Sequence, residues 1–118
     1  MKRFEQLEHP SDIGIVAYGK TLPEAFENAG AGMFSLMADI KDIAPKISFD
    51  VKAEGEDKES LLVNWLNELI YLEETKKVIL NDFKIKNFSD EKLTAKVSGE
   101  EIDQSSHKLS RPVKAATY

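Results

Sequence analysis

The sequence predicts an α+β domain in which two helices pack on one largely antiparallel or mixed sheet. Two segments, within 21–37 and 57–77, carry apolar residues at helical spacing. Six others carry short apolar or alternating runs typical of strands, so the predicted order is β-β-α-β-α-β-β-β. The chain has 118 residues, of which 42% are hydrophobic, enough for one ordinary core. We therefore expect a single domain over 1–118.

The bulk composition excludes several classes of protein. The net charge is −5, so stable binding of nucleic acid is not expected unless the surface carries a local basic patch. Cysteine is absent, which excludes disulfides, thiolate metal sites and a cysteine nucleophile. The N-terminus shows no signal peptide, and no apolar run approaches the ~18 residues of a membrane span. These features predict a soluble, cytoplasmic protein.

The N-terminal part reads as two strands joined by a turn. Residues 3–8 form the first, and His9-Pro10-Ser11-Asp12 is a turn signal. Residues 13–18 form the second, with apolar residues on both faces, which predicts a strand inside a sheet.

The first helix is predicted to begin at Thr21, a good N-cap with Glu24 in place to complete a capping box. Pro23 is tolerated because the first turn has no intrahelical partner for its missing N–H. Gly30 and Gly32 each cost about 1 kcal/mol against alanine inside a helix, so we interpret them as sites of close approach to another backbone.

Residues 47–54 alternate cleanly between apolar and polar, which predicts a strand with one solvated face. Asp57 is the expected N-cap of the second helix. That helix carries Trp65 among leucines at helical spacing and should be the main core helix. Asn64 and Asn67 border this stripe, either bonded to a neighbouring loop or merely exposed.

The remaining chain is strand-like. Residues 78–80 and 83–85 form one broken run, and the alternation around Leu93, Ala95 and Val97 predicts another strand. Residues 99–111 read as a polar connection. Residues 113–118 begin a final strand.

Catalytic signatures are missing from the sequence. It contains neither a dinucleotide-binding fingerprint nor a Walker motif, and no nucleophile elbow. Only two histidines occur, which gives little support to a zinc hydrolase. The sequence therefore favours a non-enzymatic protein.

Two places remain as candidate sites. A carboxylate at Asp12, beside His9 at the mouth of a buried strand, could bind a hard cation through oxygen. Spacing alone favours the ordinary alternative, in which Asp12 caps the turn and His9 is a loop residue. Lys114 lies between apolar neighbours and is either a functional lysine or a solvated side chain on a sheet face.

Several stretches together resemble the archease family along essentially the whole chain. They include His-Pro-Ser-Asp-Ile-Gly-Ile at 9–15, Leu-Leu-Val-Asn-Trp-Leu-Asn-Glu-Leu at 61–69, His-Lys-Leu at 107–109 and Val-Lys-Ala-Ala-Thr-Tyr at 113–118. No single stretch is decisive, but their order and spacing are specific. The resemblance implies a protein without a reaction of its own that promotes guanylylation and repeated turnover of the RNA ligase of tRNA splicing.

The resemblance also implies a divalent cation, often calcium, with Asp12 as one ligand and further ligands near the family's C-terminus. Calcium takes roughly six to eight oxygen ligands, so Asp12 alone would not hold it. The family would continue beyond Tyr118 with another strand, so we expect a C-terminally truncated form with an unpaired sheet edge. Lys114 matches the family's functional lysine, and Pro10 stands where threonine is usual.

Three functions follow as hypotheses. In the first, the Asp12 end carries the cation and docks at the ligase active site, with Lys114 contacting the ligase or a phosphate. A general chaperone or assembly factor that needs no metal is the alternative. A metal-dependent hydrolase is the weakest, because no convergent set of catalytic residues is visible.

Overall fold

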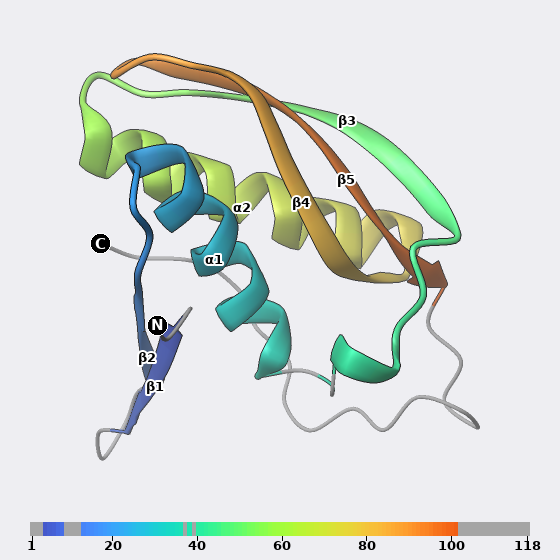
Figure 1. Cartoon of the computed structure of the whole chain (residues 1–118). Helices are drawn as coiled ribbons and strands as arrows, with labels where there is room; N and C mark the ends of the chain where they lie inside the picture. The colour runs from blue at the N-terminus through green and yellow to red at the C-terminus, as the bar shows by residue number, and fades with distance from the viewer. Residues whose placement is uncertain (1–3, 9–12, 37, 39, 102–118) are drawn as a thin grey trace.

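A computed structural model describes residues 4–8, 13–36, 38 and 40–101, with side-chain surroundings described from residue 18 onward (Figure 1). Eight elements follow one another along this part of the chain. They are β1 (Phe4–Glu8), β2 (Ile13–Ala17), α1 (Leu22–Ser35), a 3-10 turn (Ile40–Asp42), β3 (Ile47–Glu54), α2 (Lys58–Lys76), β4 (Val78–Phe88) and β5 (Lys92–Glu101).

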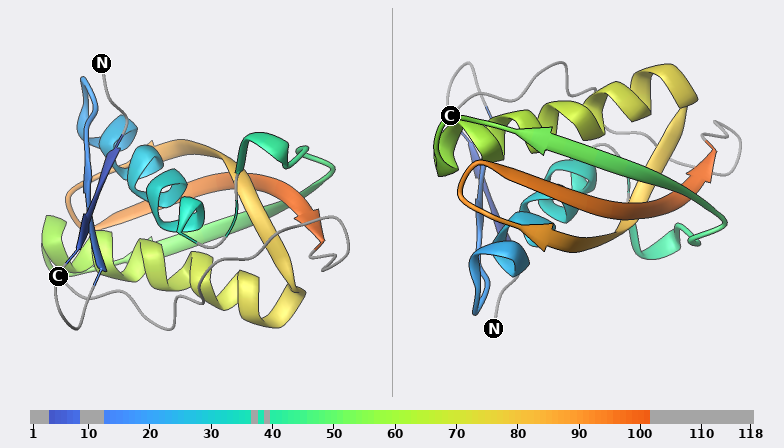
Figure 2. Two further views of the ribbon diagram at one scale, coloured as in Figure 1. Left: turned by 90° about the horizontal axis from the view of Figure 1, so that it is seen from below. Right: turned by 90° about the horizontal axis from the view of Figure 1, so that it is seen from above.

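The main sheet is antiparallel and has three strands in the order β3-β5-β4. Its register pairs Ile47 with Gly99 and Glu54 with Lys92 on one side of β5. Strands β1 and β2 form a separate antiparallel pair that contacts α1 (Figure 1). The predicted α+β class is confirmed: both helices pack on the same face of the three-stranded sheet, as Figure 2 shows from two directions.

Two of the predicted strand boundaries were wrong. The broken run at 78–85 is one continuous strand, β4, which carries irregularities at Asn81 and Lys86. Each extra residue interrupts the two-residue alternation without ending the pairing. Strand β5 continues to Glu101 where a polar connection was predicted from residue 99, because Ser98 and Gly99 are small, buried and paired. The predicted strand at 113–118 lies outside the described residues.

Helix α1 begins as predicted. The Thr21 hydroxyl accepts a hydrogen bond from the Glu24 N–H at 3.3 Å. The Glu24 carboxylate accepts from the N–H of Lys20, one residue before the cap, at 3.1 Å. On the sheet side, Glu27 accepts the outward N–H of Ile85 on edge strand β4 at 2.8 Å, so α1 satisfies part of an open sheet edge.

The close approach at Gly30 involves side chains rather than a backbone. A Cβ added there would lie 3.1 Å from Leu69 Cδ1 on α2 and 3.1 Å from Phe83 Cδ1 on β4. The glycine therefore lets α1 settle against both α2 and the sheet.

Helix α2 begins at Asp57, whose carboxylate accepts from the Ser60 N–H at 2.8 Å while the Ser60 hydroxyl accepts from the Asp57 N–H. It ends at Lys77, which has a left-handed φ of 54°. Trp65 is fully buried, and its indole N–H donates to the Phe26 carbonyl of α1 at 2.9 Å. This bond ties the two helices together inside the core.

The core lies between the two helices and the inner face of the sheet. Its largest fully buried side chains come from both helices and from β4 and β5, while β3 adds the smaller Val51 and Ala53. They are Trp65, Phe34, Leu61, Leu69, Ile79, Leu80, Leu93, Val78 and Val97. No helix in the described part of the chain is long and apolar enough to cross a membrane.

Candidate functional site

The three residues predicted from the sequence to be functional, His9, Asp12 and Lys114, all lie outside the described residues. The strands on either side of the first two are described, and Glu8 pairs with Ile13 across them. Residues 9–12 therefore join two paired strands. The functional roles of the three residues stay predictions.

A cation site does not form among the residues that the structure does describe. Within them, no three histidine, cysteine, aspartate or glutamate side chains gather in an arrangement that could hold a metal ion. Calcium needs roughly six to eight oxygen ligands. The described residues thus form no such site among themselves, and Asp12 as a ligand of the implied ion stays a prediction.

Two asparagines hold segments together: Asn64, which stood out in the sequence, and Asn28, which did not. Asn64 donates a hydrogen bond of 2.6 Å to the Glu54 carbonyl at the end of β3. Of the two interpretations given for Asn64, the structure therefore favours bonding to a neighbouring part of the chain over simple exposure. Asn28, only 7% exposed, donates to the Tyr18 carbonyl after β2 at 2.6 Å. Both amides satisfy carbonyls at strand ends, where no ladder partner continues. Their role is structural.

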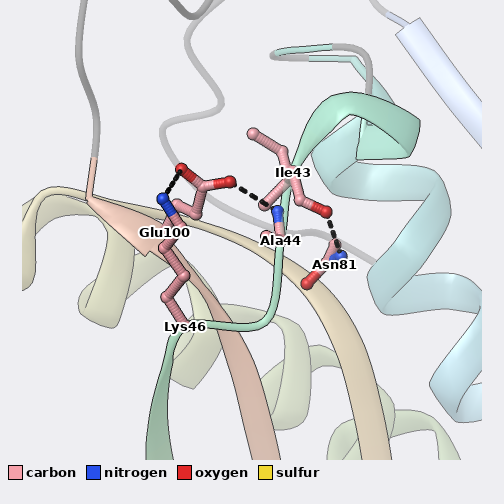
Figure 3. A network of polar contacts seen from close by, with 5 residues as sticks. All are labelled: Ile43, Ala44, Lys46, Asn81 and Glu100. Carbon is pink, nitrogen blue, oxygen red and sulfur yellow. Dashed lines mark hydrogen bonds and ion pairs between the residues drawn. The ribbon is translucent and has the colours of Figure 1, made fainter.

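A polar network fixes the loop before β3 (Figure 3). Glu100 of β5 accepts the Ala44 N–H at 2.5 Å and forms an ion pair with Lys46 at 3.6 Å. Asn81, the first irregular residue of β4, donates to the Ile43 carbonyl at 2.6 Å. The Asn81 side-chain oxygen is buried without a hydrogen-bond partner. These contacts join distant parts of the sequence, which is why no local pattern predicted them.

The outer face of the sheet carries charges of both signs. The register places Lys96 of β5 opposite Lys84 of β4 and opposite Asp50 of β3. All five lysines of this face are exposed: Lys52, Lys84, Lys86, Lys92 and Lys96. We call these five residues the lysine face. The same three strands carry five carboxylates: Asp50, Glu54, Asp82, Glu100 and Glu101.

Carboxylates lie beside the lysine face, since the register places Asp50 opposite Lys96 and Glu54 opposite Lys92. Lys84 reaches Asp82 at 3.9 Å, and both side chains are largely exposed. The other four lysines form no ion pair with any carboxylate in the described part of the chain. Lysines directly opposite one another in a sheet repel, so Lys84 and Lys96 destabilise each other slightly. Sequence reasoning missed this surface because the net charge averages over all faces.

The lysine face continues into a hollow at the hairpin end of β4 and β5. This open hollow has a volume of about 480 Å³. Lys52, Lys92 and Glu54 line it together with polar residues of the hairpin. Asn87 donates to the Thr94 hydroxyl there at 3.0 Å. The remaining lining residues are Ala53, Phe88, Ser89 and Leu93.

Among the residues that the structure describes, two carboxyl groups have a shifted pKa: Asp57 at the N-cap of α2 and Glu73 within the helix. Hydrogen bonds from the Ser60 N–H and hydroxyl lower the pKa of Asp57. Burial raises the pKa of Glu73, and the neighbouring charge of Glu74 raises it further. Neither group is on the lysine face, so these shifts concern stability rather than a site.

Comparison with known proteins gives a consistent match. A model described as the archease protein family matches residues 4–118. A relative named "Protein archease" from Pyrococcus furiosus is 41% identical over 121 aligned positions, covering 100% of this chain and 85% of that protein. Another of the same name from Methanosarcina barkeri is 39% identical and covers 99% of this chain and 83% of that protein.

A solved structure is similar throughout the chain. The solution structure of protein 1598 of Methanobacterium thermoautotrophicum superposes with a TM-score of 0.82 at 36% sequence identity. The match covers 100% of this chain and 86% of that one. The arrangement of helices and sheet described above is therefore shared with a structure determined in solution.

Proposed function

Because this chain belongs to the archease family, we propose that it is a non-catalytic activator of the RNA ligase of tRNA splicing. The observation that carries the proposal is the family match along residues 4–118, which includes every described element of the fold. The activator would promote guanylylation of the ligase and its repeated turnover in the cytoplasm. It would carry out no reaction of its own.

The β1-β2 pair supports the part of the proposal that concerns docking. Pairing of Glu8 with Ile13 fixes both ends of the segment that contains His9 and Asp12. A short segment held at both ends loses less conformational entropy on binding than a free one. We propose that this end of the domain meets the ligase, with Lys114 as a further contact to the ligase or to a phosphate.

The divalent cation, with calcium as the expected ion, remains a separate part of the proposal. The described residues do not form a site for it, so no step of the mechanism is assigned to the ion. Asp12 is the residue of this chain that we expect to hold it, and calcium titration by calorimetry tests this directly. Asp12→Asn should abolish any calcium uptake that the unchanged chain shows; uptake equal in both would remove Asp12 from the proposal.

The alternative of a general chaperone finds little support in the described surface. The large apolar side chains exposed there are Leu22, at 38%, and Tyr71, at 61%. A general holdase binds unfolded chains through contiguous apolar patches. The described surface offers scattered apolar groups instead, as on an ordinary globular protein.

The test is the rate of ligase guanylylation, measured by transfer of labelled GMP to the ligase with and without this protein at matched calcium and magnesium. Stimulation that is lost in Asp12→Ala or Lys114→Ala, with the helical circular dichroism unchanged, supports the proposal. The same chain without any effect on guanylylation, but able to suppress aggregation of denatured ligase, would favour the chaperone instead.

A further inference from the structure

We propose that the outer edge of β3 pairs with the same edge of a second copy of this chain, so that two three-stranded sheets join into one. The inference goes beyond ligase activation and does not rest on it. Strand β3 lies at one edge of the main sheet, with β5 on its inner side (Figure 1). Among the described residues no strand pairs with its other side. On the opposite edge, by contrast, Glu27 of α1 already accepts the outward N–H of Ile85.

The hydrogen bonds beside β3 identify the backbone groups that point outward. The Gly55 N–H, just past the strand, donates to the Glu91 carbonyl at 2.8 Å, so odd-numbered residues bond to the neighbouring strand. The even-numbered residues from 48 to 54 therefore direct their N–H and C=O groups away from β5. Asn64 bonds to the outward carbonyl of Glu54, as this alternation requires. No other hydrogen bond from the described part of the chain reaches these outward groups.

The charges of β3 favour one antiparallel register. Asp50 and Lys52 are exposed, lie two residues apart on the same face, and form no ion pair with a described residue. When Val51 of one copy faces Val51 of the other, each Asp50 faces the Lys52 of the second copy. A shift of two residues in either direction sets Asp50 opposite Asp50 or Lys52 opposite Lys52. Opposite charges across two strands attract and like charges repel, so the charges favour the centred register over both shifted ones.

The centred register also uses the outward backbone groups. The N–H and C=O of Asp50 would bond to those of Lys52 in the second copy, and two-fold symmetry repeats these bonds. At the far end, Asn64 already bonds to the Glu54 carbonyl, which keeps the new ladder short. On the inner face, the half-buried Phe49 would lie beside Ala53 of the second copy and gain cover.

The same charges select a second copy as the occupant. Charged side chains on an edge strand normally discourage pairing with other chains. The order of Asp50 and Lys52 is its own complement when read antiparallel, so this edge repels a strand of the wrong pattern and accepts itself. A short ladder should bury less than the roughly 800 Å² per partner of a standard interface. We therefore expect a weak dimer, populated at submillimolar concentrations and weakened by salt.

The test is sedimentation equilibrium of the full chain at low ionic strength, from about 10 μM to about 1 mM protein. The unchanged chain should approach the dimer mass at the upper end. Asp50→Lys should raise the dissociation constant by about tenfold or more, because both facing pairs become like-charged. Lys52→Asp should do the same with the opposite sign of charge. Mixed together, the two single variants should bind each other.

The exchange of both residues in one chain, Asp50→Lys with Lys52→Asp, should restore the dimer, since opposite charges face each other again. Lys84→Asp is the matched control: this lysine is exposed on the same face but belongs to β4, the other edge strand. It should leave the dissociation constant unchanged. Circular dichroism and the thermal midpoint report whether each variant is folded.

A chain that stays monomeric over the whole concentration range would overturn the proposal. So would single variants that associate as well as the unchanged chain, or a double exchange that stays as weak as the single ones. A loss in Lys84→Asp equal to that in Asp50→Lys would also overturn it, because general charge would then be the cause. Guanylylation of the ligase reports the activator role separately, so the two proposals can fail independently.

Discussion

At the scale of single residues, replacing two buried glycines by alanine should change stability by different amounts. A Cβ on Gly99 of β5 would overlap the Ile79 carbonyl oxygen of β4, which is backbone in a paired strand and cannot move aside. A Cβ on Gly30 would press on the ends of Leu69 and Phe83 side chains, which can give way. The fold therefore requires glycine at position 99, whereas a small side chain at position 30 can be accommodated.

We expect Gly99→Ala to destabilise the domain by more than about 3 kcal/mol, because it forces β4 away from β5. Gly30→Ala should lie within about 1 kcal/mol of the parent, since the gain in helix propensity offsets the crowding. Urea unfolding followed by circular dichroism measures both. Equal losses in the two variants would contradict the distinction.

Glu73 links stability to pH at the same scale. Its pKa is raised in the folded state by burial, so the folded protein binds this proton more tightly than the unfolded chain does. The resulting contribution favours folding at low pH and is lost as the pH rises through the raised pKa. Glu73 also lies in the last turn of α2, where a negative charge opposes the helix dipole.

Glu73→Gln should therefore stabilise the domain at neutral pH by a few tenths of a kcal/mol, since the side chain is partly exposed. At about pH 3, where the carboxyl is protonated in both states, the two proteins should have equal stability. Thermal unfolding at several pH values tests this. A stabilisation that persists at the acid end would point to packing of the amide instead.

At the scale of elements, the cap of α2 should make stability depend on pH in the opposite direction to Glu73. Hydrogen bonds from Ser60 lower the pKa of Asp57, so its contribution is present above the ordinary carboxyl pKa and is lost as the pH falls through the lowered value. Asp57→Ala should lower the thermal midpoint by a few degrees, whereas Asp57→Asn should keep the cap and lose its pH dependence. If Asn behaved like Ala in unfolding scans, the carboxylate charge rather than the cap bond would be the cause.

The helices and strands show how much of the fold could be predicted from the sequence. Both helices and their caps, Thr21 and Asp57, followed from capping and apolar spacing, and residues 47–54 followed from alternation. These signals are local. The continuity of β4 did not follow, because Asn81 and Lys86 break the alternation while long-range pairing with β5 continues. The end of β5 did not follow either, since residues 99–101 are polar or small and are held in the strand by pairing with residues 78–80 of β4.

The candidate site was less predictable than the fold. His9, Asp12 and Lys114 were identified by resemblance to a family, and their geometry lies outside the described residues. The lysine face could not be seen in the sequence, because Lys52, Lys84 and Lys96 are dispersed along it. Only the register of three strands brings them together. The loop network around Glu100 was missed for the same reason.

At the scale of the whole molecule, the two sheets differ in how they are held. Strand β5 is paired on both sides and covered by both helices through the core. The β1-β2 pair contacts α1 among the described elements and forms no ladder with the main sheet. Local opening should therefore need less free energy in the pair than in the main sheet.

Native-state hydrogen exchange should resolve this difference. Amides of Gln6 and Ile15 in the pair should exchange through local opening, while those of Ala95 and Val97 in β5 should exchange only on global unfolding. Increasing urea concentrations should bring the two sets together at the unfolding transition. Equal protection of both at low urea would mean that the pair and the sheet unfold as one unit.

The hydrogen bond from Trp65 to Phe26 has a practical consequence for watching the domain in solution. Trp65 is the only tryptophan in the sequence, fully buried, with its indole N–H engaged by the other helix. Its emission is therefore an intrinsic optical reporter of the contact between α1 and α2, with no label required. A red shift of the emission maximum would mark water reaching the indole, so the helix contact can be timed in a stopped-flow experiment.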